Sequence, residues 1–557
     1  EVGAVFQGSD YSGLITGDFI IKYSTRLGST FSLDALGGAN YYQLSTKSET
    51  GFISNLTVPG FFNLSNTNKP PIVTDNAVNQ KRMGLYAQVI LGFKDQLYLT
   101  GNIRNDWSST LPIANNSILY PGANASWIAS RNFTNKDIIS FLKFHAAYGR
   151  TGSDPQPYLT NARLGSGTVF LYSGSLTFPF NGVSGFGISN IIANGKLKPI
   201  FTDELEAGVE FKLFQNLLGV EATVYDKKTN GQIFTVPIAP STGYTNLVEN
   251  LGQVTNKGIE LSINVKPVNT KNLTWDLTFL YSKNWNNVDN LTGNTRNPLL
   301  TGAYEAELRA VVGKTVASIY APVPQKTPDG RIVVSARTGL PVVNTTTLDE
   351  NGMQNAYYGS GLPNYCMGLT NMLRYRNLSL NFSFDFRYGG VMYSQTAQLS
   401  QFVGNSESTV YNDRKPFIIP NSVNAVVDGT GKTSYVENKT FIGNATGSGQ
   451  SDGYYNYFNN PANLASVYQN CIFDRSFLKL RDISISYKLP DSWSSKSGSS
   501  QASVGIYGRS FLLWTPKSNI YVDPESTNFG NDLSGLFGEF ATSPVSKSFG
   551  VVLKLTF

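Results

Sequence analysis

The sequence has 557 residues, of which 13% are aromatic and only 15% are charged, and its formal net charge is +6. Basic residues are scattered along the chain, which argues against a nucleic-acid-binding protein. A single histidine and two cysteines argue against a histidine-built metal centre and a disulfide-stabilised fold. No run of about 18 apolar residues is present, so no membrane-spanning helix is predicted.

Apolar and polar residues alternate with period two along most of the chain. The pattern runs through residues 85–93, 205–213, 259–266 and 378–388, and the last of these reads LSLNFSFDFRY. Such alternation predicts strands with one apolar and one polar face. About fifteen strands are predicted in this way. They lie near 17–26, 29–44, 80–94, 96–106, 118–129, 142–151, 201–213, 217–233, 252–266, 273–285, 364–376, 377–392, 475–489, 501–513 and 545–557.

The predicted strands are joined alternately by short turns and long connections. The short turns include FKDQ at 93–96, FQNL at 214–217 and YRNL at 375–378. The long connections lie near 47–78, 107–117, 153–195, 235–250, 287–363, 393–472 and 515–543. Short turns on one side and long loops on the other are typical of an outer-membrane β-barrel. We therefore predict an all-β fold, a transmembrane antiparallel barrel.

The tryptophans fit membrane interfaces, which these side chains prefer. Trp107, Trp285 and Trp514 are expected near outer strand ends, and Trp275 and Trp493 near inner ones, with Trp127 as the exception. A core of large aromatic residues in a soluble protein is the alternative reading.

The last strand, SFGVVLKLTF, places Phe549, Val551, Leu553, Leu555 and Phe557 on one side. Its terminal aromatic residue resembles the recognition signal read by the barrel-insertion machinery. We assign this signal to Gly550, Leu553, Leu555 and Phe557. An edge strand of a soluble sheet is the alternative.

Catalytic chemistry is not predicted, so the protein is not expected to be an enzyme. His145 is expected on the lumenal face beside Lys143 and Arg150, in a polar network. Glu204 and Glu206 read as solvated wall positions rather than as an acid–base pair. Cys366 and Cys471 lie near outer strand ends, where an oxidising compartment would permit a disulfide, although another strand is expected between them.

Binding and passage of a solute are the functions that remain. The lumenal candidates for substrate contact are Arg104, Asp106, Arg150, Tyr225, Asp385 and Arg387. Tyr172, Tyr358 and the Tyr454-Tyr455-Tyr457 group could stack on sugar rings or peptide side chains, or could simply pack within loops. No cofactor is expected, although Asp523, Glu525, Asn528 and Asp532 offer oxygen ligands for calcium in an outer loop.

Several segments together resemble the SusC/RagA family of TonB-dependent outer-membrane transporters from Bacteroidota. They occur in family order over nearly the whole chain. The segments include QLYLTGNIRNDWSST (96–110), LKFHAAYGRTGS (142–153), TGYTNLVENLGQVTNKGIEL (242–261), FDRSFLKLRDISISYKLP (473–490), VDPE (522–525) and the closing strand. Trp107 departs from the family pattern, which has glycine there. Residues 348–364 lack the family's Asp-rich, calcium-like loop, so no metal site is carried over to them.

The resemblance implies a plugged barrel of about 22 strands. The chain would then be the C-terminal part of that barrel. The plug and about seven N-terminal strands would lie outside it, either in the remainder of a longer chain or, if the protein is split or nicked, on a second chain. The implied partners are a SusD-like surface lipoprotein acting as a lid, the TonB–ExbB–ExbD motor, outer-membrane lipid and lipopolysaccharide, and a glycan or peptide substrate. The expected function is active import of a large nutrient. The alternatives are a SusC-like structural subunit of a secretion or barrel-assembly complex, and a passive porin.

Overall fold

A computed structural model describes residues 3–166, 168–171, 174–178, 180–183, 185–291, 296–303, 305–443, 452–459, 470–494, 496, 498–530 and 532–557. The chain forms two compact units. Unit 1 comprises Glu1–Phe133, Lys143–Ala207 and Asp226–Gln253, and unit 2 comprises Thr134–Leu142, Gly208–Tyr225 and Val254–Phe557. No helix among the described residues is both long and apolar enough to cross a bilayer.

The main sheet has 15 strands, hydrogen-bonded in the order β1-β2-β3-β4-β5-β6-β12-β13-β16-β17-β23-β24-β29-β30-β32. Every predicted strand is present, and neighbours in the sheet are neighbours among these strands along the chain. The strands are β1 (Ala4–Leu27), β2 (Phe31–Ser54), β3 (Ile72–Phe93), β4 (Leu97–Ser108), β5 (Ser117–Ile128), β6 (Ile139–Ser153), β12 (Ile200–Leu213), β13 (Leu218–Asn230), β16 (Gln253–Asn269), β17 (Leu273–Asn290), β23 (Tyr365–Tyr375), β24 (Leu378–Tyr388), β29 (Phe477–Lys488), β30 (Gln501–Trp514) and β32 (Ser548–Thr556).

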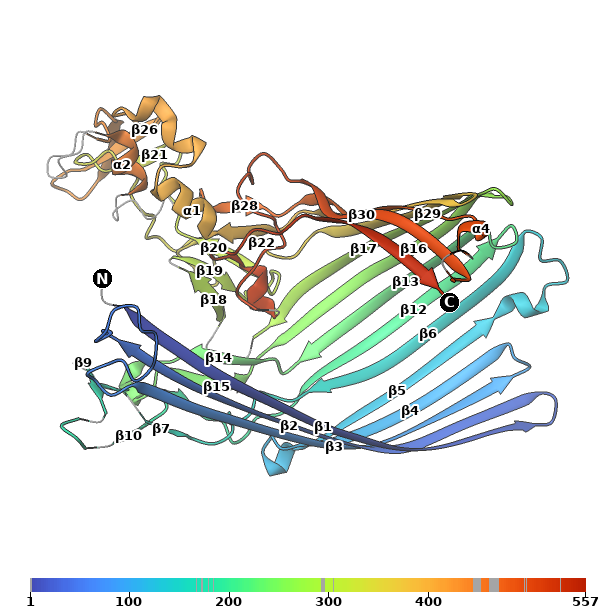
Figure 1. The fold of residues 1–557 in the computed structure, drawn as a ribbon. Helices are drawn as coiled ribbons and strands as arrows, with labels where there is room; N and C mark the ends of the chain where they lie inside the picture. Colours follow the sequence, from blue (N-terminus) through green and yellow to red (C-terminus); the bar gives the residue numbers. More distant parts are fainter. Residues whose placement is uncertain are drawn as a thin grey trace. The chain divides into compact units, whose positions relative to one another are not determined.

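The first three strands are far longer than predicted. They were expected at 17–26, 29–44 and 80–94, but β1, β2 and β3 have 24, 24 and 22 residues, and they run side by side along their length (Figure 1). About 9–11 residues cross a bilayer in a tilted strand. The additional residues mix polar side chains with apolar ones such as Phe6, Leu14 and Ile72 without strict alternation, so the pattern is hidden although the backbone pairing continues.

Charged side chains mark the end of the apolar face on β2 and β3. Lys47 pairs with Glu49 and lies 3.9 Å from Asp75 on the same face as Tyr41 and Leu85. Charged groups avoid the hydrocarbon layer. We therefore expect the ribbon from this trio to the 55–71 connection to stand outside the membrane.

Trp127 is not the exception that the sequence suggested. It is the penultimate residue of β5, at the strand end that lies on the side of the short turns, and its ring stacks on Phe144 at 5.9 Å. Trp275 holds the equivalent place in β17, next to the turn at 270–272. Connection length does not reveal the side on which this strand end lies, because the connection 129–138 is longer than the connection 109–116 at the other end of β5.

The connections of unit 1 contain small sheets of their own. The sheet β11-β15-β14 comprises Ile191–Ile192, Asn246–Asn250 and Ile233–Pro237, and β10-β7 and β8-β9 form two antiparallel pairs. The latter strands are Phe186–Ile188, Leu164–Ser166, Thr168–Leu171 and Gly174–Thr177. Short 3-10 turns occur at Ile113–Asn115, Ala129–Asn132 and Pro240–Thr242.

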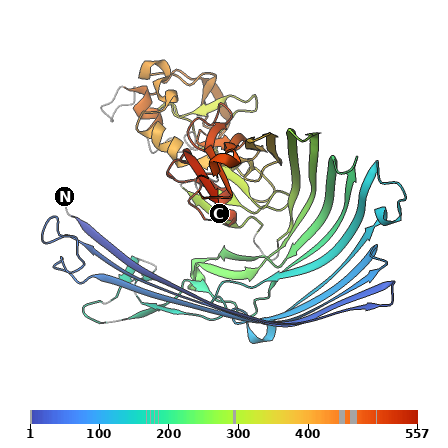
Figure 2. The same cartoon turned by 45° about the vertical axis from the view of Figure 1, so that its right-hand side comes forward.

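The three long connections of unit 2 pair with one another, as the yellow, orange and red segments of Figure 2 indicate. Their sheets are β18-β19-β20-β22 (Leu299–Ala303, Ala306–Arg309, Ser318–Ala321, Ala356–Ser360), β21-β26-β27 (Ile332–Val334, Ser422–Val427, Thr433–Glu437) and β28-β25-β31 (Ile472–Asp474, Val391–Ser394, Gly538–Glu539). Helices α1 (Gln395–Phe402) and α2 (Gly453–Phe458) and 3-10 segments at Glu407–Arg414 and Leu533–Leu536 complete these connections, and α4 (Asp491–Ser494) lies in the connection between β29 and β30.

Candidate functional site

The polar face of unit 1 carries a buried ion pair. Arg104 and Asp106 lie two residues apart on β4, and Nε of Arg104 donates to Oδ1 of Asp106 at 2.7 Å. Asp106 is only 4% exposed. Gly84 lies opposite on β3, where a Cβ would come within 2.2 Å of that carboxylate. Both predicted residues therefore face the polar side, where they neutralise each other and only Arg104 remains accessible.

Asp154 extends this network, although its role was not predicted from the sequence. It follows β6 directly, and its Oδ2 accepts hydrogen bonds from Ser108, from Thr110 at 3.1 Å and from Gln80 at 3.0 Å. Arg82 approaches the same carboxylate at 3.8 Å. These partners come from separate strands and connections, so no local sequence motif predicts their contacts with Asp154.

Arg150 does not lie on the lumenal face, which corrects the sequence-based expectation. It shares the apolar face of β6 with Phe144 and Tyr148, whereas His145 pairs with Ser126 on the opposite face. Near the end of the strand its guanidinium binds Asp203 at 2.7 and 3.1 Å, and Tyr148 donates to the same carboxylate at 2.7 Å. Tyr148 lies on the face opposite His145, and Arg150 shares Asp203 with Tyr148, so Arg150 does not lie beside His145.

Tyr225 lies on the polar face of unit 2. Its hydroxyl donates to Oδ1 of Asn284 at 3.3 Å, and its ring occupies the space opposite Gly258, where a Cβ would lie 2.3 Å from the ring. This position is open to the polar side and is compatible with contact to a solute, which stays a prediction.

Asp385 and Arg387 belong to a larger charged group that we call the rim cluster: Asp385, Arg387, Lys479, Arg481, Asp523 and Glu525. Asp385 pairs with Arg481, and Arg387 lies 3.4 Å from Glu525. Lys479 binds Asp523 and Glu525, each at 2.7 Å, and is 3% exposed. The register shifts at Arg481, so this β-bulge directs both Arg481 and Asp482 toward β24 on the polar face.

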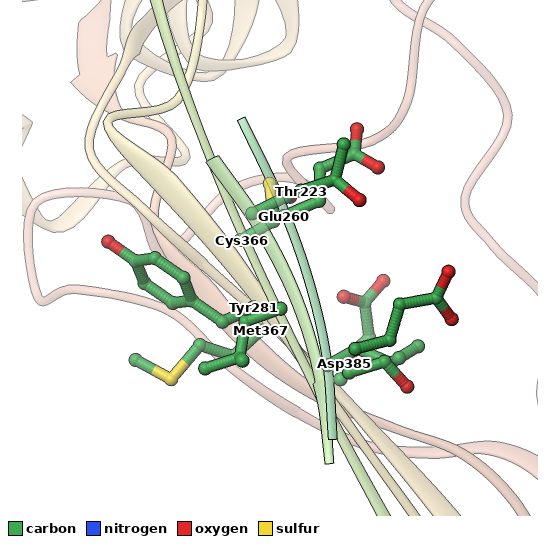
Figure 3. Close-up of a pocket in the computed structure, with 12 residues that line it drawn as sticks. Thr223, Glu260, Tyr281, Cys366, Met367 and Asp385 are labelled. Atoms are coloured by element: carbon green, nitrogen blue, oxygen red, sulfur yellow. The ribbon is translucent and has the colours of Figure 1, made fainter. Parts of the chain in front are cut away.

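Beside this cluster the polar face forms a depression of about 460 Å³. Figure 3 shows Thr223, Glu260, Cys366 and Asp385 on one side of the strands and Tyr281 and Met367 on the other. Hydroxyl, thiol and carboxylate groups line the depression. These groups can hydrogen-bond a polar solute, and Leu261, Leu280 and Met367 add apolar surface to the same lining.

The aromatic residues of the connections mostly pack within unit 2. The hydroxyl of Tyr454 donates to the backbone oxygen of Phe402 at 2.5 Å, and Tyr457 packs edge-on against Phe458 at 4.9 Å. Tyr358 is partly buried, and this burial raises the pKa of its hydroxyl to about 12. Tyr455, in contrast, is exposed to solvent. A cavity of about 680 Å³ adjoins this group. Tyr172 lies outside the described residues.

Neither Cys366 nor Cys471 forms a disulfide, which contradicts the pairing considered above. The candidate calcium ligands are engaged within the protein. Asn528 bonds the backbone of Phe540, and Asp532 accepts from the Ser534 amide at 2.9 Å. No group of three or more His, Cys, Asp or Glu residues suited to a metal ion occurs within the described ranges.

The last strand, β32, pairs with β30 and exposes its apolar side. Leu553, Leu555 and Phe557 are exposed, and Gly550 packs against the ring of Tyr507, where a Cβ would lie at 2.9 Å. The geometry is compatible with the insertion signal assigned to these residues, which remains a prediction.

Comparison with known proteins gives a consistent result. The family model described as "TonB dependent receptor-like, beta-barrel" matches residues 3–323. TonB-dependent receptor P26 of Formosa agariphila is 27% identical over 532 residues, covering 92% of this chain and 50% of the relative. TonB-dependent receptor SusC of Bacteroides thetaiotaomicron is 25% identical over 460 residues, covering 78% and 40%. The chain thus spans about half the length of the curated relatives it matches.

Among solved structures, the RagAB peptide transporter superposes with a TM-score of 0.73 at 17% identity. The superposition covers 99% of this chain and 56% of that one. At this level of identity the likeness concerns the fold.

Proposed function

Because this chain belongs to the family of TonB-dependent receptor-like β-barrels, we propose that it forms part of the barrel wall and the outer opening, or mouth, of a TonB-energised importer in the outer membrane. The cargo is a large polar nutrient, either an oligosaccharide or an oligopeptide. A SusD-like surface lipoprotein acts as its lid, and a plug completes the barrel.

The continuous polar face supports this proposal most directly. Strands of 11 to 18 residues in unit 2 present apolar side chains on one face and Glu221, Glu260, Asp385 and hydroxyl groups on the other. An apolar face suits lipid, and a polar wall suits a solvated solute. The polar groups that line the depression are suited to hydrogen bonds with a solute, which favours binding and passage.

The first test is the composition of the native complex. Denaturing mass spectrometry of the complex from native outer membranes should find a plug-containing chain together with a lipoprotein. Recovery with secretion or barrel-assembly components instead would favour the scaffold role.

The second test is uptake. Deleting the gene should abolish energy-dependent uptake of labelled oligosaccharides or of labelled oligopeptides, and the class that is lost identifies the cargo. Unchanged uptake of both classes would contradict import. Large, ligand-independent conductance of the purified full-length protein in planar bilayers would point to a passive porin.

A further inference from the structure

The connection between β30 and β32, residues 515–547, is held by charged and polar groups from three separate parts of unit 2. The first contact is the rim cluster. Asp523 and Glu525 bind Lys479, and Glu525 also accepts from Nη2 of Arg481 at 2.7 Å. The connection therefore lies directly against the polar face of β29.

Burial makes this contact difficult to release. Lys479 and Asp523 are 3% and 7% exposed. A buried charge that loses its partner is strongly destabilising, because neither water nor another charge replaces the lost interaction. Burial alone would raise the pKa of Glu525, but the hydrogen bonds from Arg481 and Lys479 outweigh it and lower that pKa to about 2.

A second contact is made by Arg475, which lies two residues before the start of β29 and is 7% exposed. Its Nε donates to the backbone oxygen of Pro524 at 2.9 Å, and its Nη1 donates to those of Leu536 at 3.1 Å and Gly361 at 3.4 Å. One guanidinium thus ties both halves of the 515–547 connection to the start of β29 and to the end of the connection before β23.

The third contact lies at Glu539, which is fully buried. Its carboxylate accepts a hydrogen bond from the hydroxyl of Ser394, the N-cap residue of α1. It also accepts hydrogen bonds from the amide and the hydroxyl of Thr396, both of them at 2.9 Å. The same carboxylate accepts from the amide of Thr542 at 3.1 Å. An acidic group at a helix N-terminus satisfies amides that have no partner within the helix.

Close backbone approach reinforces the third contact. Gly538 pairs with Tyr393 in the β25–β31 ladder, at a φ of 146°. A Cβ at this glycine would lie 1.9 Å from the Tyr393 backbone oxygen. The adjacent Phe537 ring stacks on Tyr393 at 5.2 Å. Only glycine permits this approach.

From these contacts we propose that residues 515–547 form a brace, a positioning element that fixes the base of the 389–476 connection to β24 and β29. Glu525 holds the brace on the wall, and Glu539 holds the N-terminus of α1 on the brace. The outer mouth of unit 2 is then a rigid surface. This inference concerns the mouth itself and holds whichever cargo passes through it.

Hydrogen–deuterium exchange of the full-length protein in lipid nanodiscs tests the brace. In Glu525→Gln, peptides from 519–530 should exchange faster by at least about tenfold, because the variant leaves Lys479 with one buried partner fewer. In Glu539→Gln, the increase should instead concentrate in 394–402. Glu221→Gln, the same change at an exposed wall position, should leave both regions unchanged.

Two further variants keep the test decisive. Glu525→Asp retains the charge and should restore most of the protection, which a loss of packing alone would not predict. Gly538→Ala leaves every charge in place and should release 394–402 through steric conflict. If Glu525→Gln fails to assemble, Gly538→Ala and Glu539→Gln still decide. Unchanged exchange at 394–402 in both would overturn the brace, whatever the outcome of the uptake experiments.

Discussion

Replacing Phe382 by lysine tests the assignment of the two faces of the wall. Phe382 is the fifth of 11 residues in β24 and pairs with Asn371 and Ile483. At about 3.3 Å per residue and a tilt of about 45°, it lies within roughly 3 Å of the strand midpoint. Lysine there should cost about 2–4 kcal/mol of folding free energy. Loss of the edge-to-face contact with Phe384, at 5.8 Å and 75°, adds about 0.5–1.5 kcal/mol.

The neighbouring Ser383 provides the matched control. It lies on the polar face, where its hydroxyl donates to Asp482, so lysine there gains a counter-charge and should cost less than about 1 kcal/mol. Urea-dependent folding of the full-length protein into phosphatidylcholine vesicles, followed by tryptophan fluorescence, gives both free energies. Equal losses for Phe382→Lys and Ser383→Lys would refute the face assignment.

Three further predictions concern other parts of the chain. In the folded protein, a small thiol reagent should modify the half-buried Cys366 and leave the fully buried Cys471 unmodified until denaturation, as mass spectrometry would report; the reverse order would contradict the burial described here. The pKa of Glu525 is lowered in the folded protein, so the ionised carboxylate stabilises the fold at every pH above its unfolded pKa near 4.5, and this stabilisation is lost as the pH falls through about 2. Hydrogen exchange of residues 519–530, corrected for intrinsic rates, should therefore not change between pH 7.5 and 5.5. Asp203→Asn should lower the thermal midpoint of the full-length protein by leaving Arg150 without its counter-charge on the apolar face, whereas a change no larger than that of an exposed control would contradict this placement.

Sequence alone predicted the strand content because lipid imposes a simple rule. Where one face meets hydrocarbon and the other meets water, each strand must alternate, as residues 378–388 do. The rule lapses outside the membrane, so the ends of β1, β2 and β3 were missed although their backbones remain paired. The alternation rule also requires that residues on one face be separated by an even number of positions. Arg150 is five residues from His145, so the expectation that both face the lumen did not follow this rule.

The candidate site was less predictable, because its geometry depends on distant partners. Arg104 and Asp106 share one strand, and their common face followed from alternation. The rim cluster instead joins β24 and β29 to residues 523–525, across connections whose pairing no local pattern specifies. No local sequence pattern predicts the β-bulge at Arg481 or the hydrogen bonds from Arg475 to distant backbone oxygens.

The long ribbon of β1, β2 and β3 affects how accessible this part of the protein is to proteases and antibodies. Proteases bind their substrates as extended segments with free backbone groups, which a fully paired strand does not offer. Residues 31–52 of β2 are paired on both sides, so this protruding part offers no cleavage site along that length. Cleavage, antibody recognition and tolerated epitope insertion should therefore concentrate in the connection at 55–71, where the paired strands end.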